Sequence, residues 1–278
     1  MASLLPIYRR IAKKARTALA KSSTQEIGRN ELGQETMKAD RDIENVVFEE
    51  LKKRKCAVLS EEAGYCEFGG NVQELFIIDP LDASENYKHG IPCYALGIAR
   101  AALKAGRGAG TREGGAAGAR LADVEEAFIF DLVTGDEFYA EKDNGVWRNG
   151  KPIGPSMLKE MPKAIIAIDF YNDNSRQISD STRAKALAYP KDIRRFGPAL
   201  LEMAYVACGA LEGYLNVNKS LSVVHACGPA LMREAGCTVT DHEGKPLDFG
   251  LREVGEYFTI VAAGNAEIHK KMMEILRD

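Results

Sequence analysis

The 278-residue sequence contains no apolar run near the roughly 20 residues that a membrane-spanning helix needs. Its start, Met1 to Arg10, lacks the apolar core and small-residue cleavage site of a secretory signal. Neither charge is in excess, because 37 Lys and Arg stand against 40 Asp and Glu, so no basic face for nucleic acid is indicated. A hydrophobic content of 45% excludes a disordered chain. We therefore expect a soluble, cytoplasmic globular protein that has neither nucleic acid nor a membrane as its partner.

The six cysteines form no CxxC pair and no zinc-finger spacing. Most of them have apolar neighbours, which predicts small buried thiols. Disulfides remain an open alternative, because intracellular proteins of hyperthermophiles do contain them.

Helical and strand patterns alternate along the chain, and no internal repeat interrupts them. Helices are expected over residues 4–20, 38–53, 198–208, 226–235 and 265–276, the last capped by Asn265. Strands are expected over 57–59, 75–78, 94–103, 163–170, 211–217 and 257–263, with a hairpin over 126–139 and a turn at 149–150. Residues 22–34 are expected to form a loop. This order predicts a layered α/β fold in one compact unit, with an N-terminal half over residues 1–154 and a C-terminal half over residues 155–278.

Six glycines and several alanines fill residues 104–120. Glycine loses the most backbone freedom on ordering, so a mobile surface loop is the favoured interpretation of residues 105–119. A phosphate-cradling loop is the alternative, and it is less favoured because no Lys-Ser/Thr follows the glycines and no helix clearly begins after them.

Two acidic clusters follow neighbouring apolar strands. The first is Ser60-Glu61-Glu62-Ala63-Gly64, and the second begins with Asp79-Pro80-Leu81-Asp82. Pro80 fixes one dihedral angle and has no N–H, so the turn can direct both aspartates and the Leu81 carbonyl at one cation. Oxygen ligands of this kind suit Mg²⁺. Each acid taken alone is better explained as a turn cap or a surface residue, but that explanation is much weaker for all of them together.

The second cluster continues as Ala83-Ser84-Glu85-Asn86-Tyr87, and the whole segment resembles the Asp-Pro-Ile/Leu-Asp-Gly-Thr/Ser-x-Asn-Phe signature of the inositol monophosphatase-like sugar phosphatases. That family includes archaeal enzymes that also use fructose 1,6-bisphosphate. Ser60-Glu61-Glu62 is similar to the family's Gly-Glu-Glu, and weaker matches extend over nearly the whole chain: Thr36 to Asp40, His89 to Pro92, Asn149 to Ile153 and Arg233 to Gly236. The resemblance implies an αβαβα sandwich and a homodimer.

The resemblance also implies roles for individual residues. Glu61, Asp79, the Leu81 carbonyl and Asp82 would bind Mg²⁺, as two or three ions in all. Asp40 and Ser84 would hold and activate the attacking water, with Glu61 also in the catalytic set, and the N–H groups of Ala83 and Ser84 would receive the phosphate beside Asp82. Hydrolysis of a small phosphate ester is consistent with this chemistry, since it requires neutralised phosphoryl oxygens and a nucleophile generated near neutral pH.

Two positions depart from the family pattern. The glycine after the second aspartate is Ala83 here, which is costly if that position has a positive φ and harmless otherwise. The family's Trp-Asp is replaced by Val223-Val224-His225, where counting back from Glu234 puts Val224 at the aspartate position. A one-residue shift would bring His225 there as a substitute ligand, and imidazole favours Zn²⁺ or other transition metals such as Mn²⁺. The alternative is that His225 bonds a neighbour at the start of a helix.

Substrate contacts are expected from the second half of the chain. Arg194-Arg195-Phe196-Gly197-Pro198-Ala199 resembles the family's Arg-x-x-Gly-x-Ala stretch near the substrate ring, and Asp169, Tyr171 and Asn216 resemble neighbours of the sugar hydroxyls. An arginine could also pair with a second phosphate, although Arg194 and Arg195 are equally well explained as a solvated pair. The leading substrates are inositol 1-phosphate and fructose 1,6-bisphosphate.

Three alternatives to this function stay open. One is a phosphatase of the same superfamily that acts on 3′-phosphoadenosine 5′-phosphate and has an aromatic platform near the base. The second is a sugar-phosphate-binding protein that has lost catalysis with the altered Trp-Asp site. The third, and the least favoured, is an interaction module that uses the loop over residues 105–119.

Overall fold

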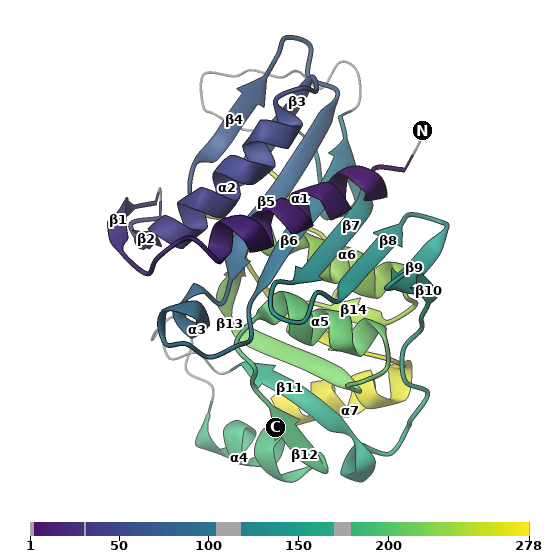
Figure 1. Cartoon of the computed structure of the whole chain (residues 1–278). Coiled ribbons are helices and arrows are strands. Elements are labelled where there is room, and N and C mark those ends of the chain that lie inside the picture. The colour runs from purple at the N-terminus through teal and green to yellow at the C-terminus, as the bar shows by residue number, and fades with distance from the viewer. Residues whose placement is uncertain (1–2, 31, 104–117, 170–178, 278) are drawn as a thin grey trace.

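Five layers, alternating between helices and sheets, make up the computed structural model of the chain (Figure 1). It describes residues 3–30, 32–103, 118–169 and 179–277, without the side chain of Lys219. The predicted αβαβα sandwich is therefore confirmed.

An eight-stranded sheet forms the second layer, in the order β10-β9-β8-β7-β6-β5-β3-β4. Only the β3–β5 pair is parallel, and every other neighbouring pair is antiparallel. The central strand β5 is buried along its whole length and carries Asp79 and Asp82 at its end. The strands are β3 (Cys56–Ser60), β4 (Gly64–Phe68), β5 (Glu74–Asp82), β6 (Ala95–Ala102), β7 (Val124–Asp131), β8 (Glu137–Glu141), β9 (Gly145–Arg148) and β10 (Lys151–Pro152).

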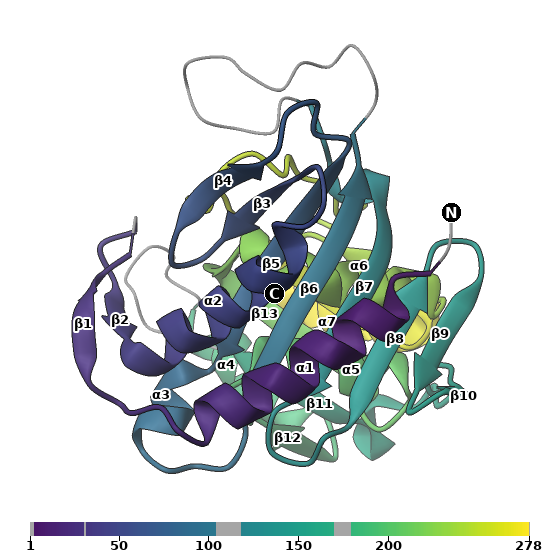
Figure 2. The same ribbon diagram turned by 45° about the horizontal axis from the view of Figure 1, so that its top comes forward.

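Helices α1 (Leu5–Leu19) and α2 (Lys38–Leu51) cover the outer face of this sheet (Figure 2). Each buries one apolar side, for example Ile11 of α1 and Ile43 of α2, against side chains of the central strands such as Phe76. Amphipathic spacing of this kind is what the sequence predicted, to within one or two residues at each end. The first turn of α2 lies near the end of β5, and this brings Asp40 toward the two aspartates.

The middle layer consists of α5 (Ala199–Ala207) and α6 (Cys227–Glu234), packed between the two sheets. Gly97 of β6 pairs with Asp79 in the ladder and allows the helices to approach closely. A Cβ at Gly97 would lie 2.8 Å from the Cys227 sulfur, nearer than atoms pack, so a larger residue there would push the helix layer away. The middle helices are thus held directly behind the end of β5.

A five-stranded sheet and two outer helices complete the layers. The strand order is β12-β11-β13-β15-β14, with β12 and β13 parallel to β11 and the other pairs antiparallel. Asn265 accepts a hydrogen bond from the Ile268 N–H at 3.1 Å, which confirms the predicted cap of the last helix. The elements are β11 (Ile165–Asp169), β12 (Asp192–Arg194), β13 (Gly213–Ser222), β14 (Thr238–Thr240), β15 (Tyr257–Ala263), α4 (Asp180–Ala188) and α7 (Ala266–Arg277).

Residues 22–34 were expected to form a loop, and this is wrong in part. β1 (Glu26–Arg29) pairs with β2 (Glu35–Met37) as a small antiparallel hairpin beside α2. All four residues of β1 are exposed, so no buried–exposed alternation marked the strand in the sequence. The short elements β4, β12, β14 and α4 were also missed, because their sequences carry little periodic signal.

Several expectations concern features outside the site. None of the six cysteines, all of which lie in the described ranges, forms a disulfide. No helix in the described residues is long and apolar enough to cross a membrane. Of the glycine- and alanine-rich stretch, residues 104–117 lie outside the described residues.

Candidate metal centre

Asp79 and Asp82 lie at the end of β5, where the pairing with β6 shifts register. Both side chains are buried. The Leu81 N–H donates to Asp79 Oδ1 at 3.1 Å, which fixes the turn between the two acids. The register shift lets two carboxylates that are three residues apart lie on the same side of the strand end.

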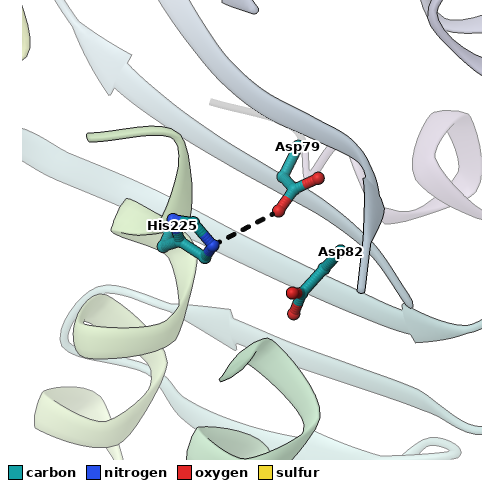
Figure 3. A group of neighbouring side chains, drawn as sticks. All are labelled: Asp79, Asp82 and His225. Carbon is teal, nitrogen blue, oxygen red and sulfur yellow. Dashed lines mark ion pairs between the residues drawn. The ribbon is translucent and has the colours of Figure 1, made fainter. Parts of the chain in front are cut away.

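His225 approaches the two aspartates from the other half of the chain (Figure 3). One ligand atom from each of Asp79, Asp82 and His225 lies within 4.8 Å of the other two. His225 Nε2 is 3.6 Å from Asp79 Oδ2, and its Nδ1 lies 3.2 Å from the Ser222 carbonyl oxygen. A three-residue cluster of mixed nitrogen and oxygen donors is thereby formed.

The 3₁₀ turn η3 (Val223–Ala226) decides which residue reaches this cluster. Val223, Val224 and Ala226 are completely buried in the apolar core, and His225 lines the cavity beside the aspartates. The count from Glu234 put Val224 at the position of the family's aspartate, but Val224 lies in the core. His225, the residue that a one-residue shift would bring to that position, lies near Asp79 and Asp82.

Glu61 comes from the turn between β3 and β4, and its charge contributes to the raised pKa of Asp79. The turn is held by buried Glu44, which accepts hydrogen bonds from the Ser60 hydroxyl and from the Ala63 N–H, the latter at 2.9 Å. The neighbouring Glu62 accepts from the hydroxyl of Thr36 in β2. Of the two adjacent glutamates, Glu61 is therefore the one that lies with the aspartates.

Burial and mutual repulsion raise the pKa values of the carboxyl groups in this cluster. Burial, followed by the charges of other carboxylates, raises the pKa of Glu61 to about 8 and that of Asp79 well above its usual value. Burial also raises the pKa values of Asp40 and Asp82 to about 7. No lysine or arginine of the described residues is among the main causes of these four pKa shifts. Such a cluster is one that a divalent cation would stabilise.

Burial lowers the pKa of His225 to about 4, so its ring is neutral at neutral pH. A neutral imidazole can ligate a metal ion, and a protonated one cannot. Together with the carboxylates, this donor set fits a divalent metal ion.

A cavity of about 920 Å³ opens beside the cluster. Its walls come from both halves of the chain, and Tyr257 at its side is 42% exposed. The volume exceeds what a single metal centre needs and leaves space for a small-molecule ligand. The lining residues are Asn30, Gln34, Glu35, Glu61, Glu62, Asp82, Ala83, Ser84, Glu85, Asp169, Gly197, Ala199, Ser220, Leu221, His225 and Tyr257.

Ala83 and Ser84 form the start of the short helix α3 (Ser84–Lys88) and line the cavity. Ala83 adopts φ +66° and ψ +49°, which is the left-handed region that favours glycine. The replacement of glycine by alanine at this position therefore costs energy. The left-handed residue turns the chain so that the first amides of α3, which have no partner within their own helix, are at the cavity.

Asp40 occupies the third position of α2, where its Oδ2 accepts from the Met37 N–H at 2.8 Å. Its charge contributes to the raised pKa values of Glu61 and Asp79, so it lies near the centre. Capping the helix fixes the direction of this carboxylate. The structure thus places Asp40 close to Glu61 and Asp79.

Asp169, one of the residues that the sequence assigned to substrate contacts, lies at the end of β11 and lines the cavity. Asn216 is completely buried in β13, and its Nδ2 donates to Ser220 Oγ at 2.8 Å and to Asp169 Oδ2 at 3.2 Å. Arg195 is 3.1 Å from Asp169 Oδ1 and has a side chain that is 58% exposed. Asn216 therefore orients Asp169 from behind and does not itself line the cavity.

Other predicted substrate residues lie differently. Gly197 lines the cavity, whereas Arg194 donates to the Ile193 carbonyl at 2.7 Å and pairs with Asp192 at 2.6 Å, outside the lining residues. Tyr171 lies outside the described residues. The sequence left a solvated pair open for both Arg194 and Arg195, and the contacts of Arg194 agree with that alternative.

Glu202 was missed by the sequence analysis. It is buried in α5 and accepts from the Phe196 N–H at 2.5 Å and from the Gly197 N–H at 3.3 Å. Burial raises its pKa to about 7. A single acid within the otherwise apolar segment Ala199–Ala207 was the signal that could have found it, because a lone buried charge needs a local partner.

Comparisons with known proteins agree with this geometry. Residues 2–278 match the model of the inositol monophosphatase family. A fructose-1,6-bisphosphatase/inositol-1-monophosphatase of Methanothermobacter thermautotrophicus is 30% identical over 227 residues, which is 80% of this chain and 76% of that protein. A bifunctional NADP phosphatase/NAD kinase of Methanococcus maripaludis is 31% identical over 253 residues, which is 87% of this chain but 43% of that protein. The crystal structure of the extragenic suppressor protein SuhB from Bartonella henselae superposes with a TM-score of 0.80 at 26% identity, covering 100% of this chain and 99% of that one.

Proposed function

The chain belongs to the inositol monophosphatase family of phosphatases, and from this premise we propose that it hydrolyses a small sugar or polyol phosphate with the help of divalent metal ions. Inositol 1-phosphate and fructose 1,6-bisphosphate are the leading substrates. The single observation that carries the proposal is the group of buried carboxylates with raised pKa values that opens into the cavity.

The residues divide into two donor sets that share Asp79. Glu61, Asp79 and the Leu81 carbonyl would hold a Mg²⁺ ion. Asp79, Asp82 and His225 would hold a second ion. The resemblance to the family implies two or three ions in all. When bound, such ions neutralise the phosphoryl oxygens and lower the pKa of a water molecule.

The chain's own groups position the other reactants. The amides of Ala83 and Ser84 are proposed to receive the phosphate, because first-turn N–H groups lack helical partners and both residues line the cavity. Ser84 and Asp40 are proposed to hold the attacking water and accept its proton. Water then forms the new P–O bond, the ester P–O bond breaks, and the leaving alkoxide takes a proton.

Asp169 is the proposed contact to a substrate hydroxyl. Asn216 and Arg195 hold its carboxylate from two sides, and an acid fixed in this way can accept hydrogen bonds from neighbouring hydroxyl groups. Arg195, which is exposed and pairs with Asp169, is in addition proposed to bind a second phosphate group, as fructose 1,6-bisphosphate would require.

A nucleotide substrate is the second candidate, and Tyr257 is the observation that favours it. This partly exposed aromatic ring lines the cavity, where it could pack against a base. The relative from Methanococcus maripaludis is named an NADP phosphatase, and 3′-phosphoadenosine 5′-phosphate would be a comparable substrate.

The experiment is phosphate release from inositol 1-phosphate, fructose 1,6-bisphosphate, NADP⁺ and 3′-phosphoadenosine 5′-phosphate, each with Mg²⁺, Mn²⁺ or Zn²⁺. Release from one of the first two, lost in Asp79→Asn, supports the proposal. Release from a nucleotide alone supports the second candidate. Binding without release under every metal would show a sugar-phosphate-binding protein and overturn both.

Two further expectations from the resemblance belong to the proposal: a homodimer and a cytoplasmic enzyme. Light scattering of the purified protein tests the first, since a dimer has twice the mass of the 278-residue chain.

A further inference from the structure

We infer that the site formed by Asp79, Asp82 and His225 binds a first-row transition-metal ion in preference to Mg²⁺, so that the two donor sets around Asp79 differ in the metal they select. The inference deepens the proposed function, on whose metal dependence it rests. It concerns the choice of ion at one of the two sets.

The two sets differ in chemistry. Around Glu61, Asp79 and the Leu81 carbonyl all donors are oxygen atoms, which suits Mg²⁺. The other set replaces one oxygen with the imidazole nitrogen of His225 (Figure 3). Imidazole suits Zn²⁺, Fe²⁺, Co²⁺ and Mn²⁺, whereas Mg²⁺ is seldom held by nitrogen.

The orientation of the ring is that of a metal ligand. His225 Nδ1 lies 3.2 Å from the Ser222 carbonyl, and because a carbonyl only accepts, Nδ1 carries the hydrogen. Nε2 therefore presents its lone pair toward Asp79 and Asp82. Metal-binding histidines usually have this arrangement, with the second ring nitrogen donating to a carbonyl or carboxylate.

A direct hydrogen bond between His225 and Asp79 explains the geometry less well. The distance of 3.6 Å from Nε2 to Oδ2 exceeds the 2.7–3.2 Å range of N–H···O hydrogen bonds. A lone pair on Nε2 facing a carboxylate oxygen is repulsive unless a proton or a metal ion lies between them, and 3.6 Å is also too long for a hydrogen bond from a protonated Asp79. The gap is thus of the kind that a shared ion closes.

The surroundings keep the ring in place. Val223, Val224 and Ala226 anchor the turn in the core, so the backbone that carries His225 cannot move without exposing them. On the facing side Asp82 Oδ2 accepts from the Leu200 N–H at 2.7 Å, which fixes that carboxylate as well. Both ligands are therefore oriented before any ion binds, which favours selectivity.

The test measures binding of the metals alone to the metal-free protein. By calorimetry, the wild type is expected to bind Mn²⁺ and Zn²⁺ at least about 10-fold more tightly than Mg²⁺. His225→Gln, which keeps an uncharged side chain with an oxygen donor, should weaken Mn²⁺ and Zn²⁺ by roughly 10–100-fold and leave Mg²⁺ within about 3-fold. His225→Glu, with a hard oxygen donor, should improve Mg²⁺ binding.

Pulsed electron paramagnetic resonance of the Mn²⁺-loaded protein gives a second readout. Coupling to a ¹⁴N nucleus is expected in the wild type and absent in His225→Gln. The matched control is His89→Gln, which removes an exposed imidazole paired with Glu85 and should keep the coupling. Circular dichroism shows whether each variant is folded.

Equal Mg²⁺ and Mn²⁺ affinities, or ¹⁴N coupling absent from a folded, loaded wild type, would overturn the inference. Its failure is distinguishable from failure of the proposed function. Phosphate release with Mg²⁺ and no nitrogen coupling refutes only the inference. Nitrogen coupling without phosphate release from any ester refutes only the function.

Discussion

The Asp82 carboxylate accepts a hydrogen bond at 2.7 Å from the backbone N–H of Leu200, a residue 118 positions away along the chain. Leu200 lies in the first turn of α5, where N–H groups have no partner within the helix. The acid at the end of β5 therefore caps a helix of the middle layer while its other oxygen remains available at the cavity. Through this one contact, residues from the two halves of the chain determine the shape of the site.

Substitutions at Asp82 should separate these two roles. Asp82→Asn keeps an oxygen for Leu200 and removes a buried charge, so the metal-free protein should be at least as stable as the wild type, yet metal binding should fall sharply because the charge is lost. Asp82→Ala should also lose metal binding and should be about 1–3 kcal/mol less stable than Asp82→Asn, since a buried N–H is left without an acceptor. Calorimetry and urea denaturation of the metal-free proteins measure the two effects. Equal stability of the two variants would contradict the capping role.

Ala83→Gly should stabilise the protein by about 1 kcal/mol, because a left-handed backbone is strained for alanine and not for glycine. The gain is measured as an increase in the free energy of unfolding. Ala184→Gly, at an exposed position in the interior of α4, is the matched control, and there the same change should destabilise by about 1 kcal/mol. If both variants lose stability, the backbone at Ala83 is not strained.

The metal-free protein should become more stable as the pH falls from 8 to about 5. The pKa values of Asp40, Asp82 and Glu61 are raised in the folded state by burial, to about 7, 7 and 8, so protonation favours folding. The stability that these groups contribute is complete below their unfolded pKa values and is lost as the pH rises through the folded ones. The lowered pKa values of His225 and His269 act in the opposite direction, but these are fewer groups.

Thermal denaturation at several pH values measures this effect. Saturating divalent metal should abolish the gain at low pH, because an ion replaces the protons in neutralising the cluster. Asp82→Asn should reduce the pH dependence of the metal-free protein. A melting temperature that rises between pH 5 and 8 without metal would contradict the repulsion assigned to these carboxylates.

Glu202→Ala should raise KM more than it lowers kcat. Its carboxylate holds the N–H groups of Phe196 and Gly197, and Gly197 lines the cavity on the side assigned to the substrate. Without the acceptor, the turn loses its position while the metal ligands keep theirs. Glu202→Gln, which retains an oxygen acceptor, is the control and should keep KM near the wild-type value. Loss of kcat alone in the alanine variant would place Glu202 with the catalytic groups.

Features that depend on neighbouring residues could be predicted from the sequence. Asp79, Pro80 and Asp82 lie within four consecutive residues, so local geometry alone brings the two aspartates together at one turn. The layered fold followed in the same way from the alternation of helical and strand patterns. Strand β1 of the small hairpin was not predicted, because all four of its residues are exposed and show no apolar pattern.

The tertiary structure alone decided which side chains complete the site. Val224 and His225 are neighbours in the sequence, and only the packing of the valines into the core leaves His225 beside Asp79. The sequence assigned Asn216 to substrate binding, yet it is buried in β13 and instead donates a hydrogen bond that orients Asp169. Local patterns report which faces of a segment are apolar. They do not report which distant segment covers each face, and that depends on burying the largest apolar area across the whole chain.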